Sequence, residues 1–208
     1  MSALEATLKS APVVPVLVIE SVADAVPLAR ALVKGGLPVL EITLRTKAAA
    51  DCIRAICAEV PEAVVGSGTV LDRAQLKLSA DLGCVFAVSP GATQALLDAA
   101  KDSSTPLLPG AATASEAMLL LEYGYILQKF FPAEPAGGAA YLSSLASPLP
   151  QISFCPTGGI GPANAKDYLK LSNVITIGGS WMAPKSLVAA KDWVAIENLA
   201  RQASGLRN

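Results

Sequence analysis

Histidine is absent from this 208-residue chain, and its absence removes the commonest general base and the commonest metal ligand in proteins. A Ser-His or Cys-His nucleophile pair is therefore excluded, and so is a metal centre held by imidazoles. Catalysis would have to use lysine, arginine, carboxylates, tyrosine, hydroxyls or thiols. The four cysteines contain no Cys-x-x-Cys pair, and we interpret them as buried, reduced thiols.

Charge is scarce as well, since charged residues make up only 16% of the chain and the formal net charge is −1. The absence of a basic run or stripe argues against a nucleic-acid partner. No apolar run reaches the roughly 18 residues of a membrane-spanning helix, and the N-terminal residues 1–14 lack the pattern of a signal peptide. We therefore expect a cytoplasmic enzyme without a membrane partner.

Short runs rich in Val, Ile and Leu alternate with alanine-rich helical patterns along the chain. We expect strands at 13–19, 38–44, 63–67, 84–89, 106–109, 126–131, 151–155 and 174–178. Helical patterns fill the intervals, at 22–35, 46–59, 72–82, 92–100, 113–123, 138–146 and 162–170. The expected N-caps are Ser21, Thr46, Asp72 and Thr113, and the expected helix stops are Gly35, Gly83 and Gly124.

Eight evenly spaced strand–helix units predict one α/β domain over 1–208, a closed (β/α)8 TIM barrel. An open doubly wound sheet would explain the alternation equally well, but a count of eight favours closure. No G-x-G-x-x-G follows the first strand, so a dinucleotide-binding fold loses its main support. We expect the residues before Ala11 to form a helix that caps the barrel floor, and 185–208 to form the last helix and a tail.

Polar side chains interrupt the second predicted strand. Side chains alternate between the two faces of a strand, so Glu41, Thr43 and Arg45 share the face opposite the leucines. The apolar face is expected to pack on helices, which leaves Glu41 and Arg45 pointing into the barrel. The alternative is a buried Glu–Arg pair that only fixes strand register, although buried ion pairs seldom stabilise a fold.

A lysine lies inside the sixth predicted strand, in the stretch ILQKFFPAE (126–134), although lysine is rarely buried without compensation of its charge. Strands two and six stand on opposite walls of an eight-stranded barrel, and alternate strands contribute to the same interior layer. Glu41 and Lys129 are therefore expected to meet across the axis. A neutral amine there can condense with a carbonyl, with Glu41 as the acid/base. The alternatives are a lysine that snorkels to the barrel mouth or merely pairs with Glu41.

Glycine-rich loops follow the last two predicted strands, as PTGGI (156–160) and GGS (178–180). Glycine lets backbone N–H groups approach an anion closely, and phosphate sites in such barrels are often built from these two loops. The pair favours a phosphorylated substrate, although each alone also fits an ordinary tight turn. GSGT (66–69) and SPG (89–91) lie at the same mouth, where turn-making and binding are equally compatible with the sequence.

The motifs PVVPVLVIE, LEITLRT, GSGTVLD, SPG, KFFPAE, FCPTGGI and IGGSW occur in this order between about Pro12 and Pro184. Together they resemble the 2-keto-3-deoxy-6-phosphogluconate (KDPG) aldolases, also known as 4-hydroxy-2-oxoglutarate aldolases. The resemblance implies a class I lyase on a (β/α)8 barrel, usually a homotrimer, that needs no metal or organic cofactor. It implies reversible cleavage of KDPG, a small phosphorylated 2-keto acid, to pyruvate and D-glyceraldehyde 3-phosphate in the Entner–Doudoroff pathway. Cleavage of 4-hydroxy-2-oxoglutarate to pyruvate and glyoxylate is implied as a further activity.

The same resemblance implies a role for each matching residue. Lys129 would form the Schiff base, and Glu41 would shuttle protons. Arg45 and Thr69 would hold the substrate carboxylate. The other implied site residues are Pro90 and Phe131 around the pocket, Thr157 at the oxygenated chain, and Gly158, Gly159, Gly179 and Ser180 at the phosphate.

Three positions depart from the usual pattern of the family. Gln128 stands where an aromatic residue often precedes the lysine, AATASE (111–116) replaces the commoner ISTxSE, and Pro135 follows PAE. The Gln128 amide is expected to face the helices, where it needs hydrogen-bond partners. Two rival functions stay open at this point. One is a phosphate-binding barrel isomerase or synthase without a covalent intermediate, and the other is a catalytically silent binding protein on the same scaffold.

Overall fold

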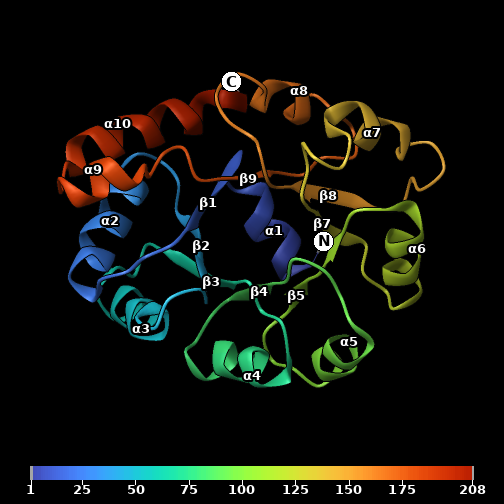
Figure 1. Ribbon diagram of the computed structural model, residues 1–208, viewed down its shortest axis with the longest axis horizontal. Helices are drawn as coiled ribbons and strands as arrows, with labels where there is room; N and C mark the ends of the chain where they lie inside the picture. Colours follow the sequence, from blue (N-terminus) through green and yellow to red (C-terminus); the bar gives the residue numbers. More distant parts are fainter. Residues whose placement is uncertain (1, 208) are drawn as a thin grey trace.

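Parallel strands form two sheets in the interior of the molecule, and helices cover their outer faces (Figure 1). The structure is a computed structural model and describes residues 2–207. The first sheet has six strands, in the order β5 (Leu107–Leu108), β4 (Phe86–Val88), β3 (Val64–Gly68), β2 (Val39–Thr43), β1 (Val13–Leu17) and β9 (Ile177–Gly179). The second sheet has three, in the order β6 (Gly110–Ala111), β7 (Leu127–Phe130) and β8 (Ser153–Pro156).

The expectation of a closed eight-stranded TIM barrel is wrong, because the hydrogen-bonded ladder is interrupted on both sides of the three-stranded sheet. The predicted strand at 106–109 is divided at Pro109, whose carbonyl accepts the Lys129 N–H but which has no N–H to return to β7. Between β8 and β9, Pro156 likewise has no N–H to donate, and among the described residues only the isolated bridges Phe154–Val174 and Thr157–Gly178 remain. The result is a curled six-stranded sheet that faces a separate three-stranded sheet.

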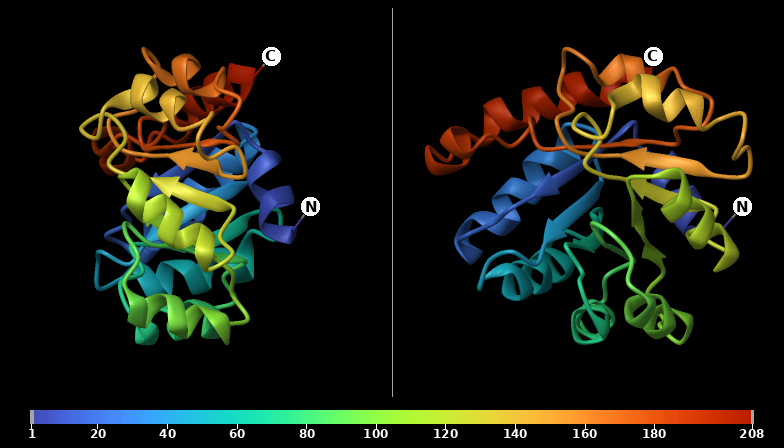
Figure 2. Two further views of the ribbon diagram at one scale, coloured as in Figure 1. Left: turned by 90° about the vertical axis from the view of Figure 1, so that its right-hand side faces the viewer. Right: turned by 45° about the vertical axis from the view of Figure 1, so that its right-hand side comes forward.

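The helices follow the strands in sequence and lie outside the sheets in all three ribbon views (Figures 1 and 2). Their bounds are α2 (Val22–Lys34), α3 (Ala49–Glu59), α4 (Arg73–Asp81), α5 (Gln94–Lys101), α6 (Ala114–Glu122), α7 (Gly138–Ser144) and α8 (Ala165–Leu169). The segment expected to hold one last helix contains α9 (Lys185–Ala189), α10 (Trp193–Ser204) and a 3-10 turn, η1 (Gly205–Arg207). None of the helices in residues 2–207 combines the length and apolar character needed to cross a membrane.

Most of the helix signals in the sequence act as expected. Thr113 forms a reciprocal capping box with Glu116 at the start of α6, and the Asp72 side chain accepts from the Gln75 N–H at the start of α4. Thr46 is the exception: α3 begins at Ala49, and the Thr46 hydroxyl instead donates to the Ile19 carbonyl at 2.6 Å. This contact ties the end of β2 to the end of β1.

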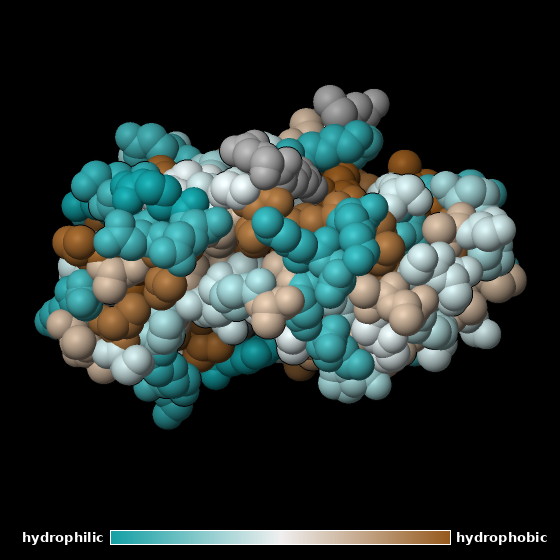
Figure 3. All heavy atoms as spheres, turned by 90° about the horizontal axis from the view of Figure 1, so that it is seen from above, coloured by the Kyte–Doolittle hydropathy of each residue, from teal (hydrophilic) through white to brown (hydrophobic). Residues whose placement is uncertain are grey.

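The N-terminal helix α1 (Ala3–Lys9) precedes β1 directly and buries Leu4 and Leu8. In Figure 1 it lies near the centre of the strands, as expected for a helix that covers the N-terminal ends of the sheets. The buried apolar side chains of the described residues form one connected cluster. On the face seen in Figure 3, hydrophilic, intermediate and apolar residues are intermixed, with a group of apolar residues near the centre. Since α1 covers the amino ends of the strands, a site open to solvent is expected at their carboxyl ends.

Close packing of β3 on β4 gives a test of the interior. Phe86 is completely buried, and a Cβ on Gly66 would overlap its ring. We expect Gly66→Ala to lower the free energy of unfolding by about 1–3 kcal/mol, because the ring has no free space to move into. Gly205→Ala is the control, since its Cβ would meet no atom within 4 Å. Equal urea midpoints for the two variants would contradict this packing.

Candidate active site

Lys129 and Glu41 meet between the two sheets. Lys129 lies on β7 and Glu41 on β2, and the distance from Nζ to Oε1 is 3.5 Å. Each side chain is only 4% exposed. Both side chains therefore point into the space that the sheets enclose, as strand parity predicts, and neither faces the helices.

Gly68 makes room for this pair. It lies opposite Thr43 in the parallel register of β2 and β3, so its missing side chain would point toward Glu41. A Cβ at this position would lie 2.7 Å from Glu41 Cγ and would overlap the carboxylate. The glycine of the GSGT motif thus has a packing reason in addition to its place near the mouth of the site.

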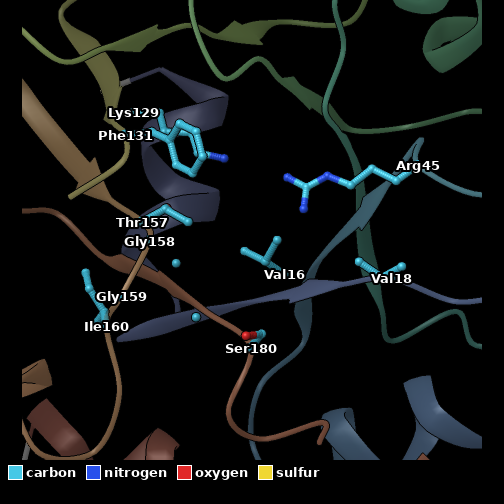
Figure 4. A pocket seen from close by; sticks show the side chains of 12 residues that line it. Val16, Val18, Arg45, Lys129, Phe131, Thr157, Gly158, Gly159, Ile160 and Ser180 are labelled. Atoms are coloured by element: carbon cyan, nitrogen blue, oxygen red, sulfur yellow. The ribbon is translucent and has the colours of Figure 1, made fainter. Parts of the chain in front are cut away.

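A cavity of about 200 Å³ opens above Lys129 at the carboxyl ends of the strands (Figure 4). Eight of the predicted site residues line it: Arg45, Lys129, Phe131, Thr157, Gly158, Gly159, Gly179 and Ser180. The lining residues that the sequence did not single out as site residues are Val16, Val18, Ile160 and Gly178. Val16 and Val18 are apolar residues in and just after a strand, and nothing in their type distinguishes them from core.

Three predicted site residues do not line the cavity. Glu41 lies beneath it, in contact with Lys129. Thr69 stands behind Arg45, whose Nε donates to its hydroxyl at 2.8 Å. The Pro90 carbonyl packs so closely on Gly110 that no side chain fits there, and Gly110 is the register partner of Lys129. Pro90 therefore contacts the strand beside the lysine.

Arg45 reaches into the cavity from the wall opposite Lys129, and the guanidinium and the Lys129 amine point toward one another in Figure 4. Thr69, which holds the guanidinium, has a φ of 60°, an unusual conformation for a β-branched residue. Backbone strain of this kind is common where a side chain must be held in a particular place at a site. An anion between Arg45 and Lys129 would be attracted by both.

On the other side of the cavity, the Thr157 hydroxyl is buried and has no hydrogen-bond partner in the structure. Gly178 leaves the space that this hydroxyl occupies, because a Cβ there would overlap it. The next two residues, Gly158 and Gly159, have φ values of 106° and 78°, which favour glycine. An unsatisfied buried hydroxyl beside such a loop is a polar group available to a ligand.

Cys155 is the register partner of Lys129 on β8, but its thiol is a poor competitor as a nucleophile. Burial, with a smaller contribution from the nearby Glu41 carboxylate, raises the pKa of the Cys155 thiol to about 12. At neutral pH the sulfur is therefore protonated, and the thiolate is the reactive form. Lys129, by contrast, lines the cavity and carries an amine, the kind of group that condenses with a carbonyl.

Gln128 faces away from the cavity and is completely buried. Its Nε2 donates to the carbonyl oxygens of Ala117 and Tyr125 at 3.0 and 2.9 Å, while its Oε1 has no partner. The Gln128 amide thus links β7 to α6 by a hydrogen bond, at a position where an aromatic side chain would only pack. This change does not touch the Lys129–Glu41 pair.

The site therefore combines an amine and a carboxylate in contact, a guanidinium on the facing wall and a glycine loop with a free hydroxyl. Within residues 2–207, no group of three or more histidine, cysteine, aspartate or glutamate side chains is arranged to hold a metal ion. The ring of Phe131 lies over the amine, with Nζ 5.1 Å from its centroid. This arrangement suits covalent binding of a carbonyl compound that carries an anionic group.

Known proteins share this chain's sequence and structure over almost its full length. A model of the family "KDPG and KHG aldolase" matches residues 4–199. The KHG/KDPG aldolase of Escherichia coli K12 is 53% identical over 199 residues, which cover 96% of this chain and 93% of that protein. The 2-dehydro-3-deoxy-phosphogluconate aldolase of Pseudoalteromonas atlantica is 52% identical over 192 residues, covering 92% of this chain and 89% of that protein.

A solved structure gives the same result at the level of the fold. KDPG aldolase from Legionella pneumophila, with pyruvate captured at low pH as a covalent carbinolamine intermediate, superimposes with a TM-score of 0.95. The two sequences are 42% identical, and the superposition covers 98% of this chain and 99% of that one. The chemistry captured there is a carbonyl compound joined covalently to the protein, which is the chemistry that a reactive amine performs.

Proposed function

Because the chain belongs to the KDPG and KHG aldolase family, we propose that it cleaves KDPG reversibly to pyruvate and D-glyceraldehyde 3-phosphate through a Schiff base on Lys129. The observation that carries the proposal is the position of the Lys129 amine, in contact with Glu41 at the base of the cavity. We include cleavage of 4-hydroxy-2-oxoglutarate to pyruvate and glyoxylate in the proposal, since that substrate shares the reacting 2-keto acid end.

The covalent step begins when Glu41 takes a proton from the Lys129 ammonium, and the neutral amine then attacks the C2 ketone of the substrate. The carbinolamine loses water with a proton from Glu41, and the resulting iminium withdraws electrons from C3. Glu41, directly or through a water molecule, then removes the C4 hydroxyl proton. The C3–C4 bond breaks, the aldehyde leaves and an enamine remains. Protonation at C3 and addition of one water molecule release pyruvate and restore the amine, so the water lost at the start is regained.

Substrate positioning falls to the two walls of the cavity. Arg45, held by Thr69, would bind the C1 carboxylate next to the reacting ketone. The unpartnered Thr157 hydroxyl would meet an oxygen of the substrate chain. Pro90 and Phe131 would shape the space around the pyruvyl group. The phosphate would be bound by Gly158, Gly159, Gly179 and Ser180, three of which have no side chain to block the approach to the backbone.

The proposal extends to assembly and location, as a homotrimer in the cytoplasm. Light scattering on the purified protein tests the oligomeric state directly, because a trimer and a monomer differ threefold in mass.

Steady-state cleavage rates test the proposed activity. We expect pyruvate and an aldehyde in equal amounts from KDPG, and the same stoichiometry from 4-hydroxy-2-oxoglutarate. The galactonate epimer of KDPG, assayed beside them, reports how strictly the site reads C4 configuration. Conversion of a phosphorylated sugar without release of pyruvate would contradict the proposal and favour an isomerase on this scaffold.

A further inference from the structure

A carboxylate and a phenol form a pair directly behind the glycine loop, and the proposed reaction uses neither. Glu134 closes the KFFPAE motif after β7, and the Tyr168 hydroxyl of α8 donates to its Oε1. Tyr168 is completely buried. Burial raises the pKa of Tyr168, and the hydrogen bond to Glu134 raises it further, so the phenol stays a donor at neutral pH. Neither residue lines the cavity.

The backbone beside Glu134 holds the loop in place. The Ala133 N–H donates to the Thr157 carbonyl at 2.8 Å, and the Glu134 N–H donates to the Gly158 carbonyl at 3.0 Å. The Glu134 side chain packs on Gly159. A Cβ on Gly159 would lie only 2.7 Å from both the Cβ and the Cγ of Glu134. Residues 133–134 are therefore the support on which the loop rests.

This arrangement places a negative charge close to the proposed phosphate subsite. Glu134 is exposed, so water screens part of its charge, but a carboxylate turned toward Gly159 would still repel a phosphate bound there. The Glu134 carboxylate avoids the cavity because one of its oxygens is held by Tyr168, which lies outside the lining. Without the phenol hydroxyl, the same flexible side chain would be free to swing toward Gly159.

We propose that Tyr168 and Glu134 are positioning residues that shape the Gly158–Gly159 loop and keep the Glu134 charge turned away from the substrate's phosphate. The inference rests on the proposed function, in that this loop is taken to bind that phosphate. The pair would then set the preference for phosphorylated over unphosphorylated 2-keto acids without touching either.

Tyr168→Phe tests the inference, because it removes the hydroxyl and keeps the ring. We expect the KM for KDPG to rise about five- to tenfold, an effect of the size of one ordinary hydrogen bond, with kcat little changed. The KM for 4-hydroxy-2-oxoglutarate, which has no phosphate, should stay the same. Adding Glu134→Gln to Tyr168→Phe should restore the KM for KDPG, since the released side chain then has no charge.

Tyr141→Phe is the matched control, since this ring packs on Phe130 and is not part of the pair. If Tyr168→Phe does not fold, Glu134→Asp replaces it, because the shorter carboxylate cannot keep the contact with the phenol. An equal rise of KM for both substrates, or a double variant that stays as weak as Tyr168→Phe, would overturn the inference.

Calorimetric titration with inorganic phosphate separates this inference from the aldolase proposal. We expect weaker phosphate binding by Tyr168→Phe than by the unmodified protein, whether or not either protein cleaves KDPG. Absence of cleavage in the unmodified protein would refute the proposed function alone. Equal phosphate affinity in the two proteins would refute the positioning role alone.

Discussion

Replacement of Lys129 by arginine is expected to lower kcat for KDPG cleavage by about four orders of magnitude or more, the scale seen when a covalent nucleophile is removed. Arginine keeps the positive charge and the contact with Glu41, but its guanidinium does not form an imine with a ketone. The measurement is the rate of pyruvate release under saturating substrate. Lys166→Arg, an exposed lysine on α8, serves as the matched control and should retain full activity.

The same variant separates a covalent mechanism from an electrostatic one. If Lys129 only attracted the substrate, the arginine variant would retain much of its rate, because its charge is unchanged. Cleavage within tenfold of the unmodified protein would therefore contradict the Schiff-base assignment. A thermal melt similar to that of the unmodified protein is needed to show that the loss is chemical.

Replacement of Glu41 by glutamine is expected to lower kcat by about 10²–10⁴-fold, the usual contribution of a general acid/base. Glutamine has nearly the same shape and still fills the space left by Gly68, but it cannot carry a proton between the intermediates. Because the chain has no histidine, no imidazole can take over this task. The measurement is single-turnover cleavage of KDPG, with Glu59→Gln as an exposed control.

A stability measurement belongs with this variant, since it leaves the buried Lys129 ammonium without its counter-charge. Breaking a buried pair in this way commonly costs about 3–5 kcal/mol, so the unfolding free energy should fall. A variant that unfolds earlier but turns over within threefold of the unmodified protein would show that Glu41 is structural. A stable but slow variant supports its role in proton transfer.

The meeting of Lys129 and Glu41 could be predicted because it depends on simple geometry. Side chains alternate along each strand, and parallel strands place their carboxyl ends at one edge, so parity alone turns both residues into the space between the sheets. The closed ring of eight strands, from which we placed them on opposite walls, was wrong. The glycine loops could be predicted equally well. Paired glycines after the last two strands indicate backbone that approaches a ligand or another segment closely. Arg45 followed from Glu41 by the same alternation.

The breaks between the two sheets could not be predicted from the sequence in the same way. Pro109 and Pro156 are visible in the sequence. A proline interrupts a ladder of hydrogen bonds, however, only where the N–H that it lacks would have pointed toward a neighbouring strand. That direction depends on register, which alternation alone does not give. The prediction of Thr46 as an N-cap was wrong for a related reason. Its hydroxyl donates to the Ile19 carbonyl of a neighbouring segment and does not cap its own helix. That Val16 lines the cavity could not be predicted, because a valine serves equally well in a buried core.

The most direct test of the covalent amine is reduction with borohydride in the presence of pyruvate, followed by mass analysis of the peptides. We predict the added mass of one reduced pyruvate on the peptide that contains Lys129, with loss of activity in proportion to labelling and no labelling of the Lys129→Arg variant. Full activity after this treatment, or the added mass on a different lysine, would contradict the account.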